Sequence, residues 1–298
     1  MNPTIPYLGE ALSFFCALVW AFAVIFFKKS GETVHPIGLN FFKNTLATIL
    51  FLPTLWIFGE TLIRPVPYTE YLLLIVSGAL GIGIADTLFF MSLNRLGAGL
   101  SAIVDCLYSP FIVTLSFWWL GEVMNIWQIV GVAMIVSAVL TALQPKARAH
   151  LSRRDVIWGA IFGILAMGCM AVGIVMIKPL LEYSPLLWST QIRLFGGVLV
   201  LGPLILFHPA RRKILISTVS AKSWRYTLFG SLLGAYLAMV LWLGGFKYTQ
   251  ASTASALNQT SNIFVFLFAG LFLRETINLQ RAIGIVIGVA GAFLVTFG

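Results

Sequence analysis

Charged residues are scarce in this sequence. Asp, Glu, Lys and Arg make up 10% of its 298 residues, whereas hydrophobic residues make up 59%. A soluble domain of ordinary composition carries about 25% charged residues. A chain of this length has no water-soluble core large enough to hide so much apolar surface. The composition therefore predicts an integral membrane protein whose outer surface faces lipid.

Alternation of polar and apolar residues is also absent. A transmembrane β-barrel shows segments of about ten residues with alternating polarity, whereas a spanning helix needs about 20 apolar residues. The runs here are of the second kind, so we expect an all-α protein with no soluble domain in its short loops. The ten predicted spans are 8–27, 36–58, 70–94, 99–120, 126–143, 156–177, 185–207, 224–246, 251–273 and 280–297.

Cysteine and histidine are rare, and neither type forms a cluster. The three cysteines lie inside apolar runs without metal-ligand spacing, and the three histidines lie in loops. A paired-carboxylate motif and a Gly-x-Ser-x-Gly turn are missing as well. We therefore expect no enzyme activity, no metal and no cofactor. Only about seven residues precede the first run, none of them Lys or Arg, which predicts a permanent span and not a cleaved signal.

The net charge of +9 is spread over short connections between the predicted spans. That pattern reports membrane orientation and not nucleic-acid binding. The first, third, fifth, seventh and ninth connections carry 14 Lys and Arg residues, and the other connections carry 3. By the positive-inside rule the basic connections face the cytoplasm. We therefore expect both termini on the extracytoplasmic side.

The two halves of the chain repeat each other. We divide it into a first five-helix unit, residues 1–145, and a second, residues 153–298. Because five is odd, the second unit must enter the membrane from the opposite side, as in the inverted repeats of secondary transporters. Two offsets carry the repeat. At 150 positions Lys28 meets Lys178, Lys43 meets Arg193 and Pro53 meets Pro203. At 153 positions Gly81 meets Gly234, Leu120-Gly121-Glu122 meets Leu273-Arg274-Glu275, and Gly131 meets Gly284.

The ends of the fourth and ninth spans, Leu120-Gly121-Glu122 and Leu273-Arg274-Glu275, resemble the EamA-type repeat of the drug/metabolite transporter superfamily. The resemblance covers essentially the whole chain. With its aromatic-rich first half and Lys28-Lys29 after the first span, the chain looks most like the exporters of aromatic and neutral amino acids (YddG-type). The resemblance implies a basket-shaped bundle in a bacterial inner membrane. It also implies a central cavity lined mainly by spans 1, 3, 4, 6, 8 and 9.

Four charged residues lie deep inside predicted spans, where charge is costly and usually faces a cavity or a partner. Lys43 and Arg193 are equivalent in the repeat, and we interpret them as structural or gating residues. Asp86 and Asp105 are candidates for binding a substrate ammonium group or a coupling proton. A salt bridge between Asp86 and Lys43 is the alternative for that pair. Whether the protein couples transport to protons stays open from sequence alone.

The ninth span is unusually polar, and its repeat mate, the fourth span, is polar at the same depth. Asp105 aligns with Asn258 and Ser109 with Asn262. Residues four apart share one helix face, and lipid does not hydrogen-bond to polar groups. We expect these two faces to line the binding site, with helix–helix contact as the alternative. The candidates are Asp105, Tyr108 and Ser109 on one span and Asn258, Gln259 and Asn262 on the other, with Pro110 as a bend.

Aromatic residues in the implied cavity spans complete the candidate site. They are Phe14, Trp20, Phe90, Tyr108, Tyr236 and Trp242. Amides supply donors and acceptors for a zwitterion without a full charge, and the aromatic rings suit a large side chain. We therefore expect a monomeric carrier in a lipid bilayer that exports neutral amino acids by alternating access. The alternatives are a carrier of another metabolite, such as a sugar phosphate or a toxic amphiphile, and a channel.

Overall fold

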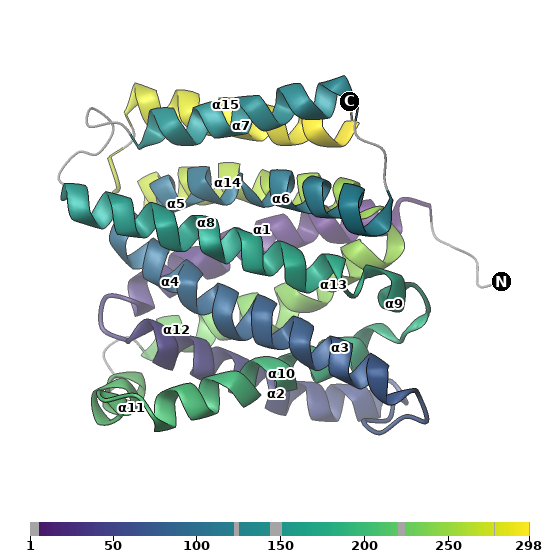
Figure 1. The fold of residues 1–298 in the computed structure, drawn as a ribbon. Coiled ribbons are helices and arrows are strands. Elements are labelled where there is room, and N and C mark those ends of the chain that lie inside the picture. Colours follow the sequence, from purple (N-terminus) through teal and green to yellow (C-terminus); the bar gives the residue numbers. More distant parts are fainter. Residues whose placement is uncertain (1–5, 122–124, 144–150, 220–223, 277, 298) are drawn as a thin grey trace.

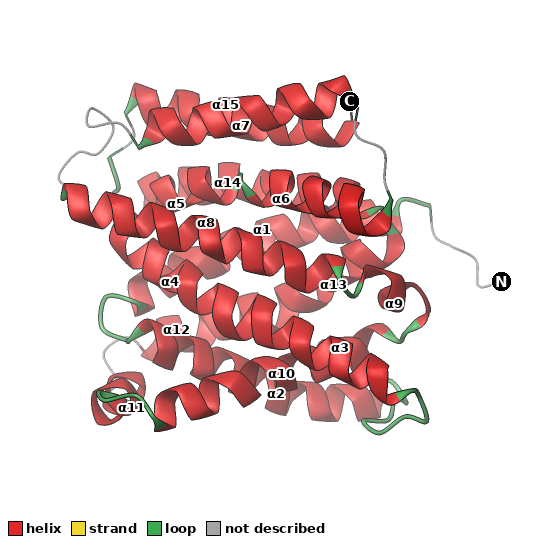
Figure 2. Cartoon of the chain, viewed as in Figure 1, coloured by secondary structure: helices red, strands yellow, loops and turns green. Residues whose placement is uncertain are grey.

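The computed structural model describes residues 6–121, 125–143, 151–219, 224–276 and 278–297. Every regular element within these ranges is a helix (Figure 2). This confirms the predicted all-α class. A helix satisfies its own backbone hydrogen bonds and can therefore lie in lipid.

The first half contains seven α-helices and two π-helical segments. The third predicted span is one continuous helix that turns from α-helical to π-helical and back. The fourth is interrupted after Asp105. The elements are α1 (Leu8–Ser30), α2 (Pro36–Ile57), α3 (Tyr68–Gly78), η1 (Ala79–Ile84), α4 (Ala85–Leu96), α5 (Ala98–Asp105), α6 (Tyr108–Leu115), η2 (Ser116–Leu120) and α7 (Ile126–Ala142).

The second half adds two short helices, α9 and α11, where the sequence predicted only connections. Its other helices occupy the predicted spans. The elements are α8 (Arg153–Val175), α9 (Lys178–Tyr183), α10 (Leu186–Leu206), α11 (Arg211–Val219), α12 (Trp224–Ser231), η4 (Leu232–Leu237), α13 (Ala238–Tyr248), α14 (Ala251–Leu273) and α15 (Leu279–Phe297).

Seven helical segments in the described part of the chain are long and apolar enough to cross a membrane. Two more, Ile126–Ala142 and Leu279–Val295, are apolar but shorter. The segment Pro36–Ile57 is long enough, but its two asparagines and Lys43 make it less apolar. All ten predicted ranges are helical, whereas their number as membrane spans stays a prediction.

The two halves interleave instead of forming separate lobes. Helix α1 packs against α12, α13 and α14 of the second half, and α8 packs against α4, α5 and α6 of the first. Helices that are equivalent in the repeat pair at the edges of the bundle: α7 lies beside α15 at one edge, and α2 lies beside α10 at the opposite edge (Figure 1). The helices between these edges surround the centre of the molecule.

Carboxylates from distant loops cap helix starts at both ends of the bundle. Glu275 accepts hydrogen bonds from the backbone N–H of Ala98 at 2.7 Å and of Gly99 at 3.0 Å. Glu60 accepts one from the backbone N–H of Trp188 at 2.9 Å. The first turn of a helix has no internal acceptors for these N–H groups and favours negative charge. These contacts tie α5 and α10 to loops of the opposite half.

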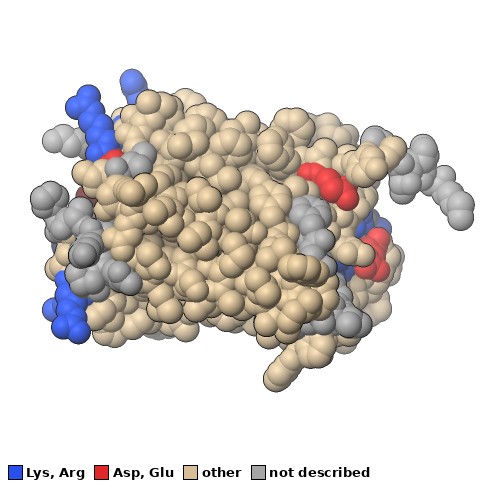
Figure 3. Space-filling view, turned by 90° about the horizontal axis from the view of Figure 1, so that it is seen from above, with Lys and Arg blue, Asp and Glu red and all other residues tan. Residues whose placement is uncertain are grey.

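On the face drawn in Figure 3, the charged side chains lie at the two ends of the bundle. Most of the visible Lys and Arg are at the left end, most of the visible Asp and Glu lie toward the right end, and the surface between them is uncharged. The left end holds α11 and the start of α8 (Figure 1). Large apolar side chains such as Leu199, Leu204 and Ile283 are exposed. An apolar belt between charged ends is the surface that a membrane-spanning protein needs.

Helices α3 and α10 cross in direct backbone contact, which gives a test of the packing. A Cβ at Gly196 would overlap the backbone of Ile75. We expect Gly196→Ala to cost about 1–3 kcal/mol of stability, as overpacking does, measured by thermal unfolding in detergent. Gly202→Ala is the matched control on α10, because a Cβ there meets nothing within 4 Å. Equal melting temperatures for the two variants would contradict the close crossing.

Candidate functional site

A cavity of about 110 Å³ lies between the two halves. A single buried water needs about 10–15 Å³ of such volume, so the cavity has room for a small organic molecule. All six spans implied by the resemblance contribute lining residues. Helices α2 and α10 add one residue each, Lys43 and Arg193. The two cations therefore reach the cavity from α2 and α10, the neighbouring helices at one edge of the bundle.

The lining residues are largely equivalent in the repeat. At many positions, both members of a pair equated by the offsets of 150 and 153 line the cavity. The pairs are Ala17 with Met167, Trp20 with Met170, Lys43 with Arg193, Gly81 with Gly234, Asp86 with Met239, Phe89 with Trp242, Asp105 with Asn258 and Tyr108 with Ser261. The same face of each helix in the two halves therefore looks into one shared space.

The backbone beside the cavity repeats as well. The π-helical segments Ala79–Ile84 and Leu232–Leu237 are separated by the repeat offset of 153 positions, and each carries a glycine of the cavity wall, Gly81 and Gly234. A π-helical turn inserted into an α-helix is less regular than its flanks and is frequent at functional sites. Both halves therefore place the same backbone irregularity next to the cavity.

Proline explains how Asp105 comes to end a helix. Pro110 has no backbone N–H and its ring clashes with the carbonyl four residues earlier. That carbonyl belongs to Cys106, and α5 ends at Asp105 while α6 begins at Tyr108. The predicted bend is therefore an interruption of the helix. Pro110 itself is buried outside the cavity lining.

Four lining side chains have buried polar atoms without a hydrogen-bond partner. They are Arg193 through Nη1, Asp105 through Oδ1, Tyr108 through its hydroxyl and Asn258 through both Nδ2 and Oδ1. Leaving such groups unsatisfied costs about 1–3 kcal/mol each, and more for charged groups. The four side chains come from both halves of the chain and line one cavity. Their arrangement suits a polar ligand that supplies the missing partners.

The guanidinium of Arg193 is fixed in place by neutral groups. Its Nε donates to Ser77 Oγ at 2.9 Å, and its Cζ lies 5.1 Å from the ring centroid of Trp242. The side chain is only 1% exposed. Within the described ranges, no carboxylate oxygen lies within 4.0 Å of a guanidinium nitrogen of Arg193, the distance that defines an ion pair. Arg193 is thus a buried, positioned cation that retains a free donor.

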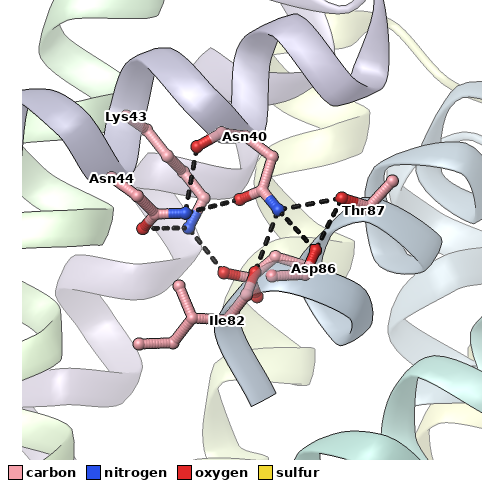
Figure 4. Close-up of polar contacts among 7 residues, drawn as sticks. Asn40, Lys43, Asn44, Ile82, Asp86 and Thr87 are labelled. Carbon is pink, nitrogen blue, oxygen red and sulfur yellow. Dashed lines mark hydrogen bonds and ion pairs between the residues drawn. The ribbon is translucent and has the colours of Figure 1, made fainter. Parts of the chain in front are cut away.

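Lys43 and Asp86 form a buried ion pair with 2.6 Å between Nζ and Oδ2. Figure 4 shows how a polar network surrounds the pair. Asn44 Oδ1 accepts a second hydrogen bond from Lys43 Nζ at 3.3 Å, and Asn44 Nδ2 donates to Asn40 Oδ1 at 2.8 Å. Asn40 Nδ2 in turn donates to Thr87 Oγ1 at 2.9 Å. The salt bridge named as the alternative for Asp86 is therefore present.

The remaining polar candidates of α14 are engaged with one another. Asn262 Nδ2 donates to Gln259 Oε1 and, at 3.5 Å, to Cys106 Sγ. Gln259 Nε2 donates to the backbone carbonyl of Asp105 at 3.3 Å. Both residues line the cavity, but their amides also hold α14 against the break in the fourth span. Asn258 is the amide of this face that stays available.

The structure separates the sequence candidates into two groups. Trp20, Asp86, Asp105, Tyr108, Trp242, Asn258, Gln259 and Asn262 line the cavity, as do Lys43 and Arg193. The other five lie elsewhere. Phe14 is 44% exposed and contacts Phe264, Phe90 packs on Phe27 and Phe89, Tyr236 shares a hydrogen bond with Thr54, and Ser109 and Pro110 are buried in α6.

Sequence reasoning missed several apolar lining residues. Met167, Met170, Met239 and Phe89 belong to the wall, although no polarity distinguishes them from ordinary membrane residues. The repeat carried the missing signal: these four align with Ala17, Trp20, Asp86 and Trp242. Methionine is flexible and polarizable and adapts to irregular surfaces. No group of three or more potential metal ligands occurs in the part of the chain that the structure describes.

The fold and the site together define a class of protein, the membrane transporters: apolar helices long enough to span a bilayer enclose a cavity between two repeated halves, and charged, amide and aromatic side chains line it. The profile of the EamA-like transporter family matches residues 7–144 and again residues 157–297. The chain belongs to the EamA-like transporter family, within the drug/metabolite transporter superfamily. This confirms the predicted superfamily and a transporter as the kind of protein.

Relatives and a solved structure agree with this membership. An uncharacterized transporter of Archaeoglobus fulgidus is 24% identical over 277 residues, covering 92% of each chain. The protein PecM of Dickeya dadantii is 27% identical over 217 residues, covering 72% of this chain and 69% of its own. One crystal structure shares the fold with a TM-score of 0.72 at 17% identity, covering 97% of this chain and 96% of that one.

The buried ion pair allows a direct test of the site's electrostatics. Lys43→Met leaves Asp86 as a buried charge without its partner, which costs about 3–5 kcal/mol, whereas replacing both charges by apolar groups is often neutral. We therefore expect Lys43→Met to lower the melting temperature in detergent. The double variant Lys43→Met/Asp86→Met should recover most of that loss. A double variant as unstable as the sum of the single ones would show that the two side chains do not act as a pair.

Proposed function

We propose that this protein is a secondary transporter that exports neutral amino acids, aromatic ones included, by alternating access. The observation that carries this proposal is the charge balance of the cavity. Lys43 and Asp86 neutralise each other in an ion pair. Arg193 and Asp105 line the same cavity, and each has a buried polar atom without a partner.

A zwitterion has the complementary charges. Its carboxylate accepts hydrogen bonds from the free Nη1 of Arg193, because a guanidinium binds carboxylates in a planar, charge-assisted geometry. Its ammonium group donates to Oδ1 of Asp105, and Asn258 supplies both a donor and an acceptor. The formal charges of the four lining residues Lys43, Asp86, Asp105 and Arg193 sum to zero, so a neutral zwitterion leaves no buried charge uncompensated.

The apolar wall suits the side chain of such a substrate. Trp20, Phe89 and Trp242 contribute aromatic rings, and Met167 and Met170 contribute flexible thioethers. Aromatic pairs stabilise by about 0.5–1.5 kcal/mol beyond burial, and sulfur–aromatic contacts by about 0.3–1.5 kcal/mol. A large apolar or aromatic side chain therefore finds partners here that a sugar or a phosphate does not.

Alternating access follows from the repeat. Equivalent residues of the two halves line one cavity, and equivalent segments of both are π-helical. Two five-helix units of opposite orientation in a ten-span protein exchange roles when the cavity opens first to one side and then to the other. The interleaved packing of α1 and α8 supports this arrangement. We propose that one chain is sufficient for this cycle.

The distribution of charge supports an orientation with both termini on the extracytoplasmic side of a bacterial inner membrane. Lys and Arg concentrate at one end of the bundle (Figure 3), as the positive-inside rule requires of the cytoplasmic end. Arg153 and Arg154 start α8 at that end. Lys146, Arg148 and Lys222, which the charge count includes, lie outside the described residues.

An anionic cargo such as a sugar phosphate is the second candidate. It would be attracted by Lys43 and Arg193, but two carboxylates in the same wall oppose it. A channel is a further alternative, and counterflow of labelled substrate against unlabelled substrate excludes it.

Uptake by proteoliposomes tests the substrate class. We expect counterflow of phenylalanine and leucine but not of glucose 6-phosphate. Asn258→Ala removes a hydrogen bond worth about 0.5–1.5 kcal/mol, so we expect the apparent affinity for phenylalanine to fall by about two- to tenfold. Ser255→Ala is the matched control, because Ser255 is buried on the same helix outside the cavity lining. Sugar-phosphate flux without amino-acid flux would refute the proposal.

A reporter fusion tests the orientation. We expect a C-terminal alkaline phosphatase fusion to be active, because that enzyme folds only outside the cytoplasm, and a C-terminal green fluorescent protein fusion to be dark. Fusion of the same reporters within 208–210, a connection on the basic side, should give the opposite result. A fluorescent C-terminal fusion would place the termini in the cytoplasm and overturn this orientation.

A further inference from the structure

The ion pair of Lys43 and Asp86 is a feature that substrate binding alone does not require. Both residues line the cavity, yet each already has a charged partner at 2.6 Å. Lys43 is 1% exposed and Asp86 is 4% exposed. An ionisable pair at this depth in a membrane protein marks a functional pathway more often than a structural contact.

The second half of the molecule shows that the fold does without this pair. The repeat equivalents of Lys43 and Asp86 are Arg193 and Met239. The equivalent helices of the second half, α10 and α13, therefore pack with a thioether in place of the carboxylate. Arg193 is held by Ser77 instead. Removing a buried ion pair in favour of apolar residues is often neutral or stabilising. Stability does not account for the pair in the first half.

Lys43 also has a partner that does not depend on the charge of Asp86. Asn44 Oδ1 accepts from Lys43 Nζ, and Asn40 positions the amide of Asn44 (Figure 4). Asn40 itself donates to the backbone carbonyls of Ile82 at 2.9 Å and Gly83 at 3.0 Å, which belong to η1. The network therefore holds Lys43 when Asp86 is neutral, and it links the pair to the π-helical segment beside the cavity.

The groups around Asp86 determine how its charge acts on the cavity. Helix α8 has a titratable group at mid-span, Cys169, and has its charges in the first turn. The charged or titratable side chains in the other elements that surround the cavity are Lys43 from α2, Arg193 from α10, Cys16 from α1, Asp105 from α5 and Tyr108 from α6. Asp86 and Asp105 are thus the two carboxylates that balance the two cations.

We propose that Asp86 is the proton-binding group of the transport cycle and that proton entry drives amino-acid exit, an inference that rests on the proposed function. The step is a protonation: the Asp86 carboxylate takes one proton from water on the extracytoplasmic side and releases one proton to the cytoplasmic side. Lys43 keeps its hydrogen bond to Asn44 Oδ1 throughout. No electrons are transferred and no covalent bond other than O–H forms or breaks.

Competition between proton and substrate provides the coupling. Protonation of Asp86 removes half of the negative charge in the cavity wall and leaves the charge of Lys43 unbalanced. The cavity then repels the ammonium group of a zwitterion, because charges a few ångströms apart interact strongly in a site of low dielectric. Substrate leaves when the proton binds, and the proton leaves before substrate binds again on the cytoplasmic side.

Proteoliposomes with a pH gradient test this mechanism. Vesicles loaded with labelled phenylalanine are diluted into medium one pH unit more acidic, with the membrane potential clamped by valinomycin and potassium. One-to-one exchange sets a limiting accumulation ratio of about tenfold per pH unit. Each rate is divided by the same protein's exchange rate without a gradient, so that changes in basal activity cancel. Asp155→Asn, in the first turn of α8 outside the cavity lining, is the control.

We expect acid outside to accelerate efflux for the wild type and for Asp155→Asn, and to have no effect on Lys43→Met/Asp86→Met. A wild type that exchanges phenylalanine without responding to the gradient overturns the proton coupling and leaves the proposed function intact. Acceleration retained in the double variant overturns the assignment to Asp86. The absence of any amino-acid exchange by the wild type refutes the proposed function itself.

A binding measurement covers the case in which the double variant does not exchange substrate. The Kd for phenylalanine is measured in detergent as a function of pH. For the wild type we expect the Kd to rise as the pH falls through the titration of Asp86, and for the double variant to stay flat. A double variant whose Kd follows the pH as the wild type does contradicts the proposal.

Discussion

Polar groups buried inside this protein need hydrogen-bond partners from the protein itself, because the surrounding lipid tails offer none. The arrangement of the centre of the molecule depends on that constraint. Most buried polar side chains solve the problem locally: Asn40 bonds to backbone carbonyls, and Gln259 and Asn262 bond to each other. Arg193, Asp105, Tyr108 and Asn258, which line the cavity, are among the buried side chains that have a polar atom without a partner. Because an unsatisfied buried group costs free energy, a ligand in the cavity that bonded to these four would lower that cost.

The repeated helices of the two halves form that cavity, and the differences between equivalent residues make its two sides chemically different. Equivalent helix faces meet in the centre, so the wall has nearly matched residue positions. The residue types differ in a consistent way. Both carboxylates, Asp86 and Asp105, come from the first half, and their equivalents are Met239 and Asn258. A frame of this kind, with both acids in one half, would orient the zwitterionic substrate that we propose, whereas a fully symmetric wall would not.

Much of the fold was predictable because lipid imposes a strong and regular demand on sequence. Helical content, the positions of the long helices and the polar face of α14 all follow from runs of apolar residues and their interruptions. The site was predictable only in part. Trp20 and Trp242 reach the cavity, whereas Phe14 and Tyr236 in the same predicted spans pack elsewhere. The rotation of a helix about its own axis decides between them, and an almost uniformly apolar sequence does not encode that rotation.

The sequence by itself determined that the chain is a membrane protein of repeated halves, because hydropathy and repeat offsets are properties of the linear chain. It also placed Lys43 and Arg193 in equivalent positions. Only the tertiary structure decided that Lys43 meets Asp86 while Arg193 keeps a free donor. That difference depends on which side chain faces each cation across a helix interface, at a sequence separation of 43 residues for Lys43 and Asp86. Contacts of this kind are set by packing and not by any local pattern.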